Sequence, residues 1–161
     1  MDIHKLTGAE AKEINTWQYE EPYSLYSFSG SKEGIEELLD GTYYGCCNEH
    51  RELIGYFCFG ENAQVPGGRA AKLYVGEDTV DIGLGMKPGL TGKGMGKSFF
   101  QVGLQFALKE FQPKRIRLSV ATFNKRAIAL YENVGFRKNI SFMSRGREFL
   151  LMEYDLGEYR F

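Results

Sequence analysis

Apolar side chains recur three or four residues apart in four stretches of the chain, the spacing that predicts a helix with one buried face. The two shorter helices are predicted over 9–17 and 32–39, the second with Ser31 as its N-cap. A longer one follows the glycine-rich segment 91–98, buries Phe100, Leu104, Ala107, Leu108 and Phe111, and ends before Pro113. The last begins after Asn124, ends at Gly135, and buries Ala127, Leu130, Tyr131 and Val134.

Runs of β-branched and aromatic residues predict strands between these helices. They cover 2–6, 42–48, 52–59, 80–86, 115–122, 136–143 and 149–154. Polar turns join the second strand to the third and the sixth to the seventh, so two hairpins are expected. Residues 18–31 and the segment around Pro66-Gly67-Gly68 are predicted to be irregular. The order of elements predicts a mixed α/β fold.

Length and charge exclude several classes of protein. The chain has 161 residues, which suits one domain, and its 20 basic and 21 acidic side chains nearly cancel. Non-specific electrostatic binding to nucleic acid or to an anionic membrane is therefore not expected. The first residues lack the pattern of a signal peptide, and no apolar run approaches the ~20 residues of a membrane span. These features predict a cytoplasmic protein.

The cysteines predict neither a disulfide framework nor a metal site. There are three, Cys46, Cys47 and Cys58, an odd number with two adjacent. The chain has no CxxC motif and only two histidines, His4 and His50, so a zinc site is not expected. The three thiols are predicted to be small apolar filler in strands of a reduced protein.

The segment Gly92-Lys93-Gly94-Met95-Gly96-Lys97 lies between a predicted strand and a predicted helix. Glycines let successive amides turn toward one point, and the amino end of a helix adds a positive dipole. With two lysines added, the loop suits a phosphate or pyrophosphate. A tight turn that simply needs small residues is the plain alternative.

Two nucleotide-binding motifs match this loop only in part. Gly96-Lys97-Ser98 is the end of a P-loop, but Thr91 stands where the first glycine belongs. The strand RIRLSVATF that follows has no aspartate to hold magnesium. The dinucleotide fingerprint G-x-G-x-x-G is one residue out of register and lacks the acidic residue that should follow it.

Two motifs together resemble the GNAT (GCN5-related N-acetyltransferase) superfamily over about residues 72–155. Met86-Lys87-Pro88 followed by Thr91-Gly92-Lys93-Gly94-Met95-Gly96 is similar to the family's Q/R-x-x-G-x-G/A motif after a V-x-P-like strand end. The segment NKRAIALYENVGF, from Asn124 to Phe136, looks like the family's N-x-R-A-I-x-L-Y-E-x-x-G-F. The resemblance implies an α/β (α+β) fold whose mixed, mostly antiparallel sheet of about six to seven strands is flanked by helices and splayed at the acyl-CoA site. It also implies a single domain over 1–161, with acceptor-side elements at 1–60.

The same resemblance implies acetyl-CoA as the acyl donor and no metal. Pantetheine would pair with the backbone of Leu84, Gly85 and Met86, where an amide would stabilise the oxyanion. Gly83 and Gly85 independently fit a bulge that parts two neighbouring strands. The pyrophosphate would bind Thr91, Gly92, Lys93, Gly94, Met95, Gly96 and Lys97. Thr91 departs from the family's Gln or Arg, which removes one contact, and Asn124 would both cap its helix and reach the CoA arm.

Tyr131 is implied to be the general acid that protonates the departing thiolate, although its spacing alone fits a core tyrosine. Some relatives place a glutamate base five residues before the motif's asparagine, where this chain has Ser119. Asp81 on the neighbouring strand is the candidate base. Its alternatives are a water chain or an acid from Glu20-Glu21, and a solvent-facing strand residue is the other interpretation of Asp81.

The acceptor pocket is expected in the N-terminal half. Glu20 and Glu21 would attract a cationic amine there, beside the aromatic residues Trp17, Tyr19, Tyr23, Tyr26 and Phe28. A hydrophobic flap over the sheet fits these residues equally well. The implied acceptor is a primary amine of a small molecule or a protein, and the branch that modifies protein N-termini and ribosomal proteins is one candidate. A non-catalytic acyl-CoA-binding or sensor module is the alternative function, and a homodimer stays open.

Overall fold

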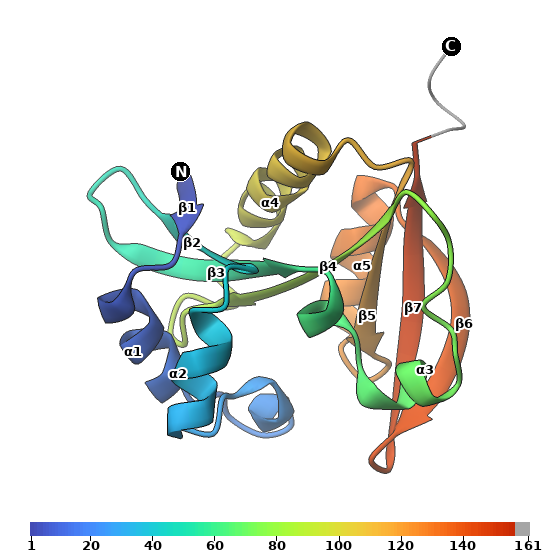
Figure 1. Cartoon of the computed structure of the whole chain (residues 1–161), viewed down its shortest axis with the longest axis horizontal. Coiled ribbons are helices and arrows are strands. Elements are labelled where there is room, and N and C mark those ends of the chain that lie inside the picture. Colours follow the sequence, from blue (N-terminus) through green and yellow to red (C-terminus); the bar gives the residue numbers. More distant parts are fainter. Residues whose placement is uncertain (157–161) are drawn as a thin grey trace. The chain divides into compact units, whose positions relative to one another are not determined.

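The computed structural model describes Met1–Leu156, so the end of the predicted domain, 157–161, lies outside it. The strands are β1 (Asp2–Lys5), β2 (Tyr43–Cys47), β3 (Leu53–Phe59), β4 (Thr79–Met86), β5 (Arg115–Ala121), β6 (Arg137–Ser144) and β7 (Arg147–Asp155) (Figure 1). The helices are α1 (Gly8–Thr16), α2 (Lys32–Leu38), α3 (Pro66–Ala70), α4 (Gly96–Phe111) and α5 (Lys125–Val134). Short 3-10 turns cover Tyr23–Tyr26 and Glu61–Ala63. The predicted alternation of strands and helices is confirmed.

The strands form a seven-stranded sheet in the order β1-β2-β3-β4-β5-β7-β6. β1 with β2, β2 with β3, β5 with β7 and β6 with β7 all pair antiparallel, whereas β4 and β5 are parallel. The mixed, mostly antiparallel sheet is therefore as predicted. β4 pairs with β5 over three residues only, from Thr79 opposite Arg115 to Asp81 opposite Arg117.

The chain forms two compact units, each built from two stretches of sequence. The first consists of Met1–Cys58 and Leu84–Gly103, and the second starts with Phe59–Gly83 and resumes at Leu104. A division between an acceptor part at 1–60 and a donor core at 72–155 does not coincide with these units. The single domain over 1–161 stays a prediction.

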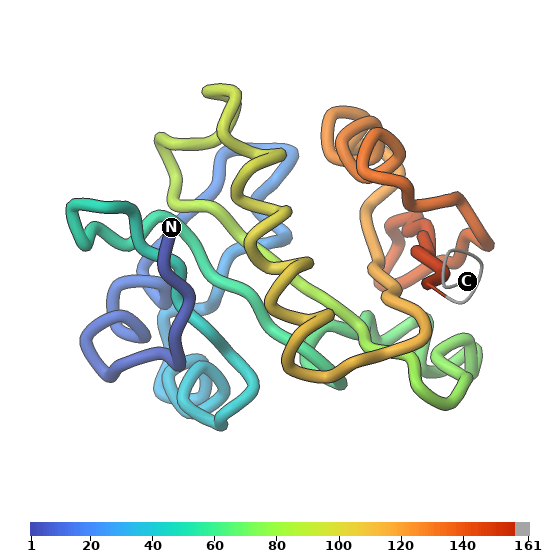
Figure 2. The backbone as a smooth tube through the Cα atoms, turned by 90° about the horizontal axis from the view of Figure 1, so that it is seen from above, coloured from blue at the N-terminus to red at the C-terminus, as the bar shows by residue number. Residues whose placement is uncertain are grey.

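In the first unit, a capping box starts α1. The Thr7 hydroxyl accepts from the Glu10 amide at 3.2 Å, and the Glu10 carboxylate accepts from the Thr7 amide at 2.9 Å. α1 packs against α2 on one side of the β1–β2–β3 strands, and the start of α4 lies on the other side (Figures 1 and 2). On that second side, the rings of Phe57 and Phe99 stack with centroids 4.5 Å apart and are fully buried.

In the second unit, the β6–β7 hairpin turns at Arg145 and Gly146, both with positive φ, which such a tight turn requires. α3 packs against β6, although this segment is predicted to be a loop. The helix forms for one local and one tertiary reason. Locally, Pro66 favours the first helical position. The tertiary reason is that the Gly67 amide donates to the Ser144 hydroxyl at 2.9 Å. Gly67 also lies against the Met143 carbonyl so closely that no side chain would fit.

A buried ion pair joins β4 to β5 at the last paired position. The Arg117 guanidinium donates from Nε to Asp81 Oδ1 at 2.6 Å and from Nη2 to Oδ2 at 2.8 Å. The two side chains are 4% and 5% exposed. The Gln64 amide donates to the same carboxylate at 2.9 Å, and Arg117 Nη1 donates to the Val75 carbonyl at 2.8 Å. Burial alone would lower the pKa of Arg117, but the hydrogen bond and charge of Asp81 raise it above its usual value.

Asp81→Asn should destabilise the fold strongly, because it leaves the Arg117 charge buried without its counter-charge. The expected loss is about 3–5 kcal/mol of the free energy of unfolding, measured by urea denaturation. Asp78→Asn is the matched control, since Asp78 is exposed and lies 3.9 Å from an exposed Lys114. It should change stability by less than about 1 kcal/mol. Equal urea midpoints for the Asp81 and Asp78 variants would contradict a stabilising role for the buried ion pair.

Candidate functional site

The glycine-rich loop before α4 is exposed and built from left-handed backbone. Gly92 and Gly94 have φ of 74° and 79°, and a Cβ at Gly94 would meet no atom within 4 Å. Gly94 is therefore required by the backbone conformation and leaves open space beside the loop. Lys93 and Lys97 are exposed on either side of it.

α4 begins where this loop ends. The Met95 carbonyl accepts from the Phe99 amide at 3.0 Å, so the first-turn amides after Met95 have no partner within the helix. These amides carry the positive end of the helix dipole. The Ser98 hydroxyl donates to the Met95 carbonyl at 3.1 Å, a backbone contact rather than one prepared for magnesium. The loop is thus suited to an anion.

The end of β4 is shaped by an aromatic ring. A Cβ at Gly85 would lie 2.6–2.7 Å from atoms of the Tyr56 ring, which is closer than carbon atoms approach. Gly85 therefore makes room for a neighbouring side chain, whereas the sequence interpretation had a strand bulge or a ligand in that role. Leu84, Gly85 and Met86 are all half-buried.

Tyr19 connects the predicted acceptor segment to this strand end. Its hydroxyl donates to the Met86 carbonyl at 2.6 Å, and both residues belong to the first unit. Burial raises the pKa of Tyr19, so the hydroxyl keeps its proton and remains a donor. The Tyr19 amide in turn donates to the Ser27 hydroxyl at 3.0 Å. The segment between Trp17 and Phe28 is therefore held against the last residue of β4.

An aromatic cluster surrounds Tyr56 in the same unit. Its ring centroid lies 6.2 Å from that of Trp17, 5.9 Å from Phe28 and 6.0 Å from Tyr43. Trp17 and Phe28 belong to the predicted acceptor set, but Tyr43 and Tyr56 do not. The sequence does mark Tyr43 and Tyr56 as large aromatic residues in the strands predicted at 42–48 and 52–59. Single-strand patterns do not reveal which face meets the segment at 17–28.

In the second unit, α5 carries the residues of the second motif. The Asn124 side chain accepts from the Ala127 amide at 3.3 Å, which confirms the predicted N-cap. Tyr131 is 8% exposed, and its ring centroid lies 6.2 Å from that of Phe136. The core position predicted from spacing is confirmed, whereas the roles of Asn124 toward CoA and of Tyr131 as an acid stay predictions.

The candidate base has a different environment from the one predicted. Both carboxylate oxygens of Asp81 already accept hydrogen bonds, from Arg117 and from Gln64, and the residue is buried rather than solvent-facing. Taking a proton from an amine would require breaking this pairing, so the geometry favours a structural role over a catalytic one. Ser119, at the position of the family's glutamate, shares a 2.6 Å hydrogen bond with the Tyr74 hydroxyl.

The cysteines are free and buried in β2 and β3, as predicted. Burial raises the pKa of Cys46 to about 11, so this thiol is protonated at neutral pH. Within the described residues, none of the helices combines the length and the apolar character that crossing a bilayer would take.

Comparisons with known proteins agree on the fold. The family model described as "Acetyltransferase (GNAT) family" matches residues 9–136. A spermidine N-acetyltransferase SpeG chimera from Vibrio cholerae and hSSAT is similar in structure, with a TM-score of 0.72 at 19% identity over 99% of this chain and 98% of that one. An acetyltransferase (GNAT family) from Bacillus anthracis gives a TM-score of 0.73 at 16% identity over 96% and 93%. A search of the curated proteins finds no match.

The family model spans most of the chain and includes both the glycine loop and the motif at 124–136. The mixed, mostly antiparallel sheet with flanking helices that the sequence resemblance implies is the one observed. The chain therefore belongs to the acetyltransferase (GNAT) family and is an acetyl-CoA-dependent N-acetyltransferase.

Proposed function

We propose that this acetyltransferase acts on a small amine that carries more than one positive charge, and that the amine is received beside the carboxyl end of β4. The observation that carries the proposal is the hydrogen bond from Tyr19 to the Met86 carbonyl. It ties the segment that bears Glu20 and Glu21 to the strand end where the acetyl group is expected. This contact supports the proposal because it joins the proposed acceptor segment to the proposed donor strand at Met86.

Charge in the first unit supports a cationic acceptor. Acidic residues outnumber basic ones along 10–40, and Glu20, Glu21, Glu33 and Glu36 are exposed. Among the neighbouring aromatic residues, Trp17 and Tyr56 are buried, whereas Phe28 is half-buried and can offer part of its ring to a cation. The spermidine N-acetyltransferases among the similar structures act on a polycation, which supports a polyamine as the first probe. Protein N-termini, the branch suggested by the sequence, are the competing acceptor class.

For the donor, we propose that the loop Thr91–Lys97 holds the CoA pyrophosphate and that Leu84, Gly85 and Met86 hold the pantetheine arm. Open space beside Gly94 and the first-turn amides of α4 fit an anion with little help from side chains. Because backbone amides would hold the anion, we expect CoA to bind even though Thr91 replaces the family's Gln or Arg. Acetyl-CoA supplies the activated thioester, and this chain's backbone amide at 84–86 would polarise its carbonyl.

For the proton transfers, we propose that Tyr131 protonates the leaving thiolate and that Asn124 contacts the CoA arm while it caps α5. The family motif at 124–136 supports both roles. Asp81 is held by Arg117 and Gln64, which leaves a water chain or an acid from Glu20-Glu21 to receive the proton of the amine. These two routes differ in their effect on kcat, which an experiment can separate.

Acetyl-CoA should raise the melting temperature of the protein, while ATP with magnesium should not. At 100 times the Kd, binding adds about 2.7 kcal/mol, or roughly 5–10 °C for a chain of this size. Gly94→Ala should reduce the shift, because a side chain there strains the loop and fills the open space. Gly89→Ala is the matched control, since Gly89 also has positive φ and open surroundings. A shift with ATP alone would contradict the donor assignment.

Tyr131→Phe should lower kcat by ~10- to 10⁴-fold and leave the Kd for acetyl-CoA nearly unchanged, because only the acidic hydroxyl is removed. Tyr154→Phe is the control: its ring contacts the same Phe136, with centroids 5.3 Å apart. Steady-state kinetics and calorimetric binding measure the two quantities. Unchanged turnover in the Tyr131 variant would reject it as the acid.

A panel of amines should give the highest kcat/KM for spermidine, lower values for a monoamine of similar length, and the lowest for a peptide N-terminus. Glu20→Gln should raise the KM for spermidine about fivefold, the effect of ~1 kcal/mol from one solvated charge. Glu77→Gln, an exposed acid of the second unit, should change nothing.

The outcome of that panel also separates the alternatives. A fall in kcat rather than a rise in KM would make Glu20 the base. Preference for the peptide would overturn the polyamine assignment. A chain that binds acetyl-CoA but acetylates no amine would be the non-catalytic binding module.

A further inference from the structure

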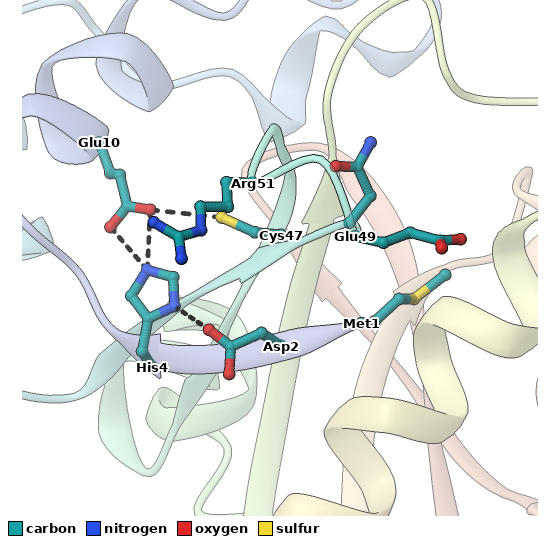
Figure 3. Close-up of a pocket in the computed structure, with 8 residues that line it drawn as sticks. Met1, Asp2, His4, Glu10, Cys47, Glu49 and Arg51 are labelled. Atoms are coloured by element: carbon teal, nitrogen blue, oxygen red, sulfur yellow. Dashed lines mark hydrogen bonds and ion pairs between the residues drawn. The ribbon is translucent and has the colours of Figure 1, made fainter.

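Three potential metal ligands from three different elements meet at the amino end of the chain. They are His4 on β1, Glu10 on α1 and Cys47 on β2, and their ligand atoms all lie within 4.8 Å of one another (Figure 3). His4 Nε2 lies 2.8 Å from Glu10 Oε2, and Cys47 Sγ lies 3.7 Å from the same oxygen. All three belong to the first unit, and none is among the residues assigned above to acetyl-CoA or the amine.

Neighbouring groups orient these ligands. His4 Nδ1 lies 3.1 Å from the Asp2 carboxylate, and Nε2 lies 2.8–3.0 Å from both oxygens of Glu10. When a cation displaces the proton from Nε2, Asp2 can hold the proton on Nδ1 and keep the ring in this orientation. The Thr7 amide donates to Glu10 Oε1 at 2.9 Å, and Oε2 is the oxygen nearer to the other two ligands. A carboxylate behind a histidine and a backbone donor behind a carboxylate are the supports that metal ligands typically have.

The cluster borders a pocket of about 690 Å³, whose other lining residues are Met1, Asp2, Asn48, Glu49 and Arg51. The ligands are partly to well protected: the His4 side chain is 33% exposed, that of Glu10 is 16% exposed and Cys47 is 8% exposed. The pocket is lined by the carboxylates of Asp2, Glu10 and Glu49, and by fewer cationic groups, namely the Arg51 guanidinium and the terminal amine of Met1. The surroundings therefore favour a cation and leave room for a solvent ligand.

We propose that His4, Glu10 and Cys47 bind a divalent metal ion of the zinc class, with the fourth coordination position open to this pocket. Nitrogen, sulfur and oxygen together suit a borderline-soft ion, and three protein ligands are the set of an open zinc site. Around a tetrahedral zinc, such ligand atoms lie about 3.3–3.6 Å apart. The 2.8 Å and 3.7 Å separations here are near these values, and the three ligand atoms, all within 4.8 Å of one another, would have to draw together around the ion.

Without an ion, the cluster is a hydrogen-bonded group in which Cys47 donates to Glu10. Burial and the nearby Glu10 raise the pKa of Cys47, which keeps the proton on the sulfur. A bound cation would replace the repulsion between thiolate and carboxylate by attraction to both, and the thiol proton would be released to solvent. The competing explanation is that the three side chains serve only to join β1, α1 and β2.

Titration of the chelator-stripped protein with Co²⁺ tests the proposal. One equivalent should give the near-ultraviolet charge-transfer band of a cobalt thiolate, and Zn²⁺ should abolish it by displacement. Cys47→Ala should lose the band, whereas Cys46→Ala, which removes the same sulfur from the adjacent buried residue, should keep it. His4→Gln should weaken Zn²⁺ binding by more than about 100-fold, and Asp2→Asn by ~10- to 100-fold as an outer-shell change.

His50→Gln is the control for the histidine, because His50 is exposed and outside the cluster. The proposal fails if the wild-type protein shows no saturable Co²⁺ band, a result that does not depend on any variant folding. It also fails if the Cys46 and Cys47 variants behave alike. Acetyl transfer is not the readout, so the result is independent of the proposed function.

Discussion

A buried guanidinium must find partners for its donors, and this requirement organises the second unit. Arg117 satisfies it with the carboxylate of Asp81, the carbonyl of Val75 and the ring face of Tyr74, whose centroid lies 5.0 Å from the guanidinium carbon. The pair also holds the last position at which β4 and β5 align. Asp81 is therefore held in a buried hydrogen-bonded network near the start of β4.

The proposed donor site uses backbone where many anion sites use side chains. Positive φ at Gly92 and Gly94 and the exposed amino end of α4 present amides whose positions do not depend on a rotamer. Such a site tolerates the loss of one polar side chain, as at Thr91, better than the loss of a glycine. The acceptor side is the opposite case, because its character comes from side chains of the segment around Tyr19 and Glu20.

Local signals explain what the sequence could predict. The N-caps Ser31 and Asn124, the helix stop at Gly135 and the turn near Gly146 each depend on a few neighbouring residues, and all are observed. The glycine-rich loop is predicted in the same way, since Gly92, Gly94 and Gly96 alternate within one short segment.

Long-range contacts explain what it could not predict. α3 depends on a partner in β6, and the role of Asp81 depends on Arg117, 36 positions away. Cys47 and Glu10 are 37 positions apart in the sequence. A search for metal-ligand motifs with short spacings therefore cannot find the cluster of His4, Glu10 and Cys47. Tyr56 was missed because its importance comes from Gly85 on another strand.

The contact between Tyr56 and Gly85 has a consequence for how the family's scaffold can vary in this chain. The two residues share one volume, which the ring fills because the glycine leaves it empty. A larger residue at position 85 requires a smaller one at position 56, so it is the combined volume of the two side chains that is constrained. A relative with a side chain on β4 at this point would have to give up the aromatic ring, and with it the centre of the cluster that joins Trp17, Phe28 and Tyr43.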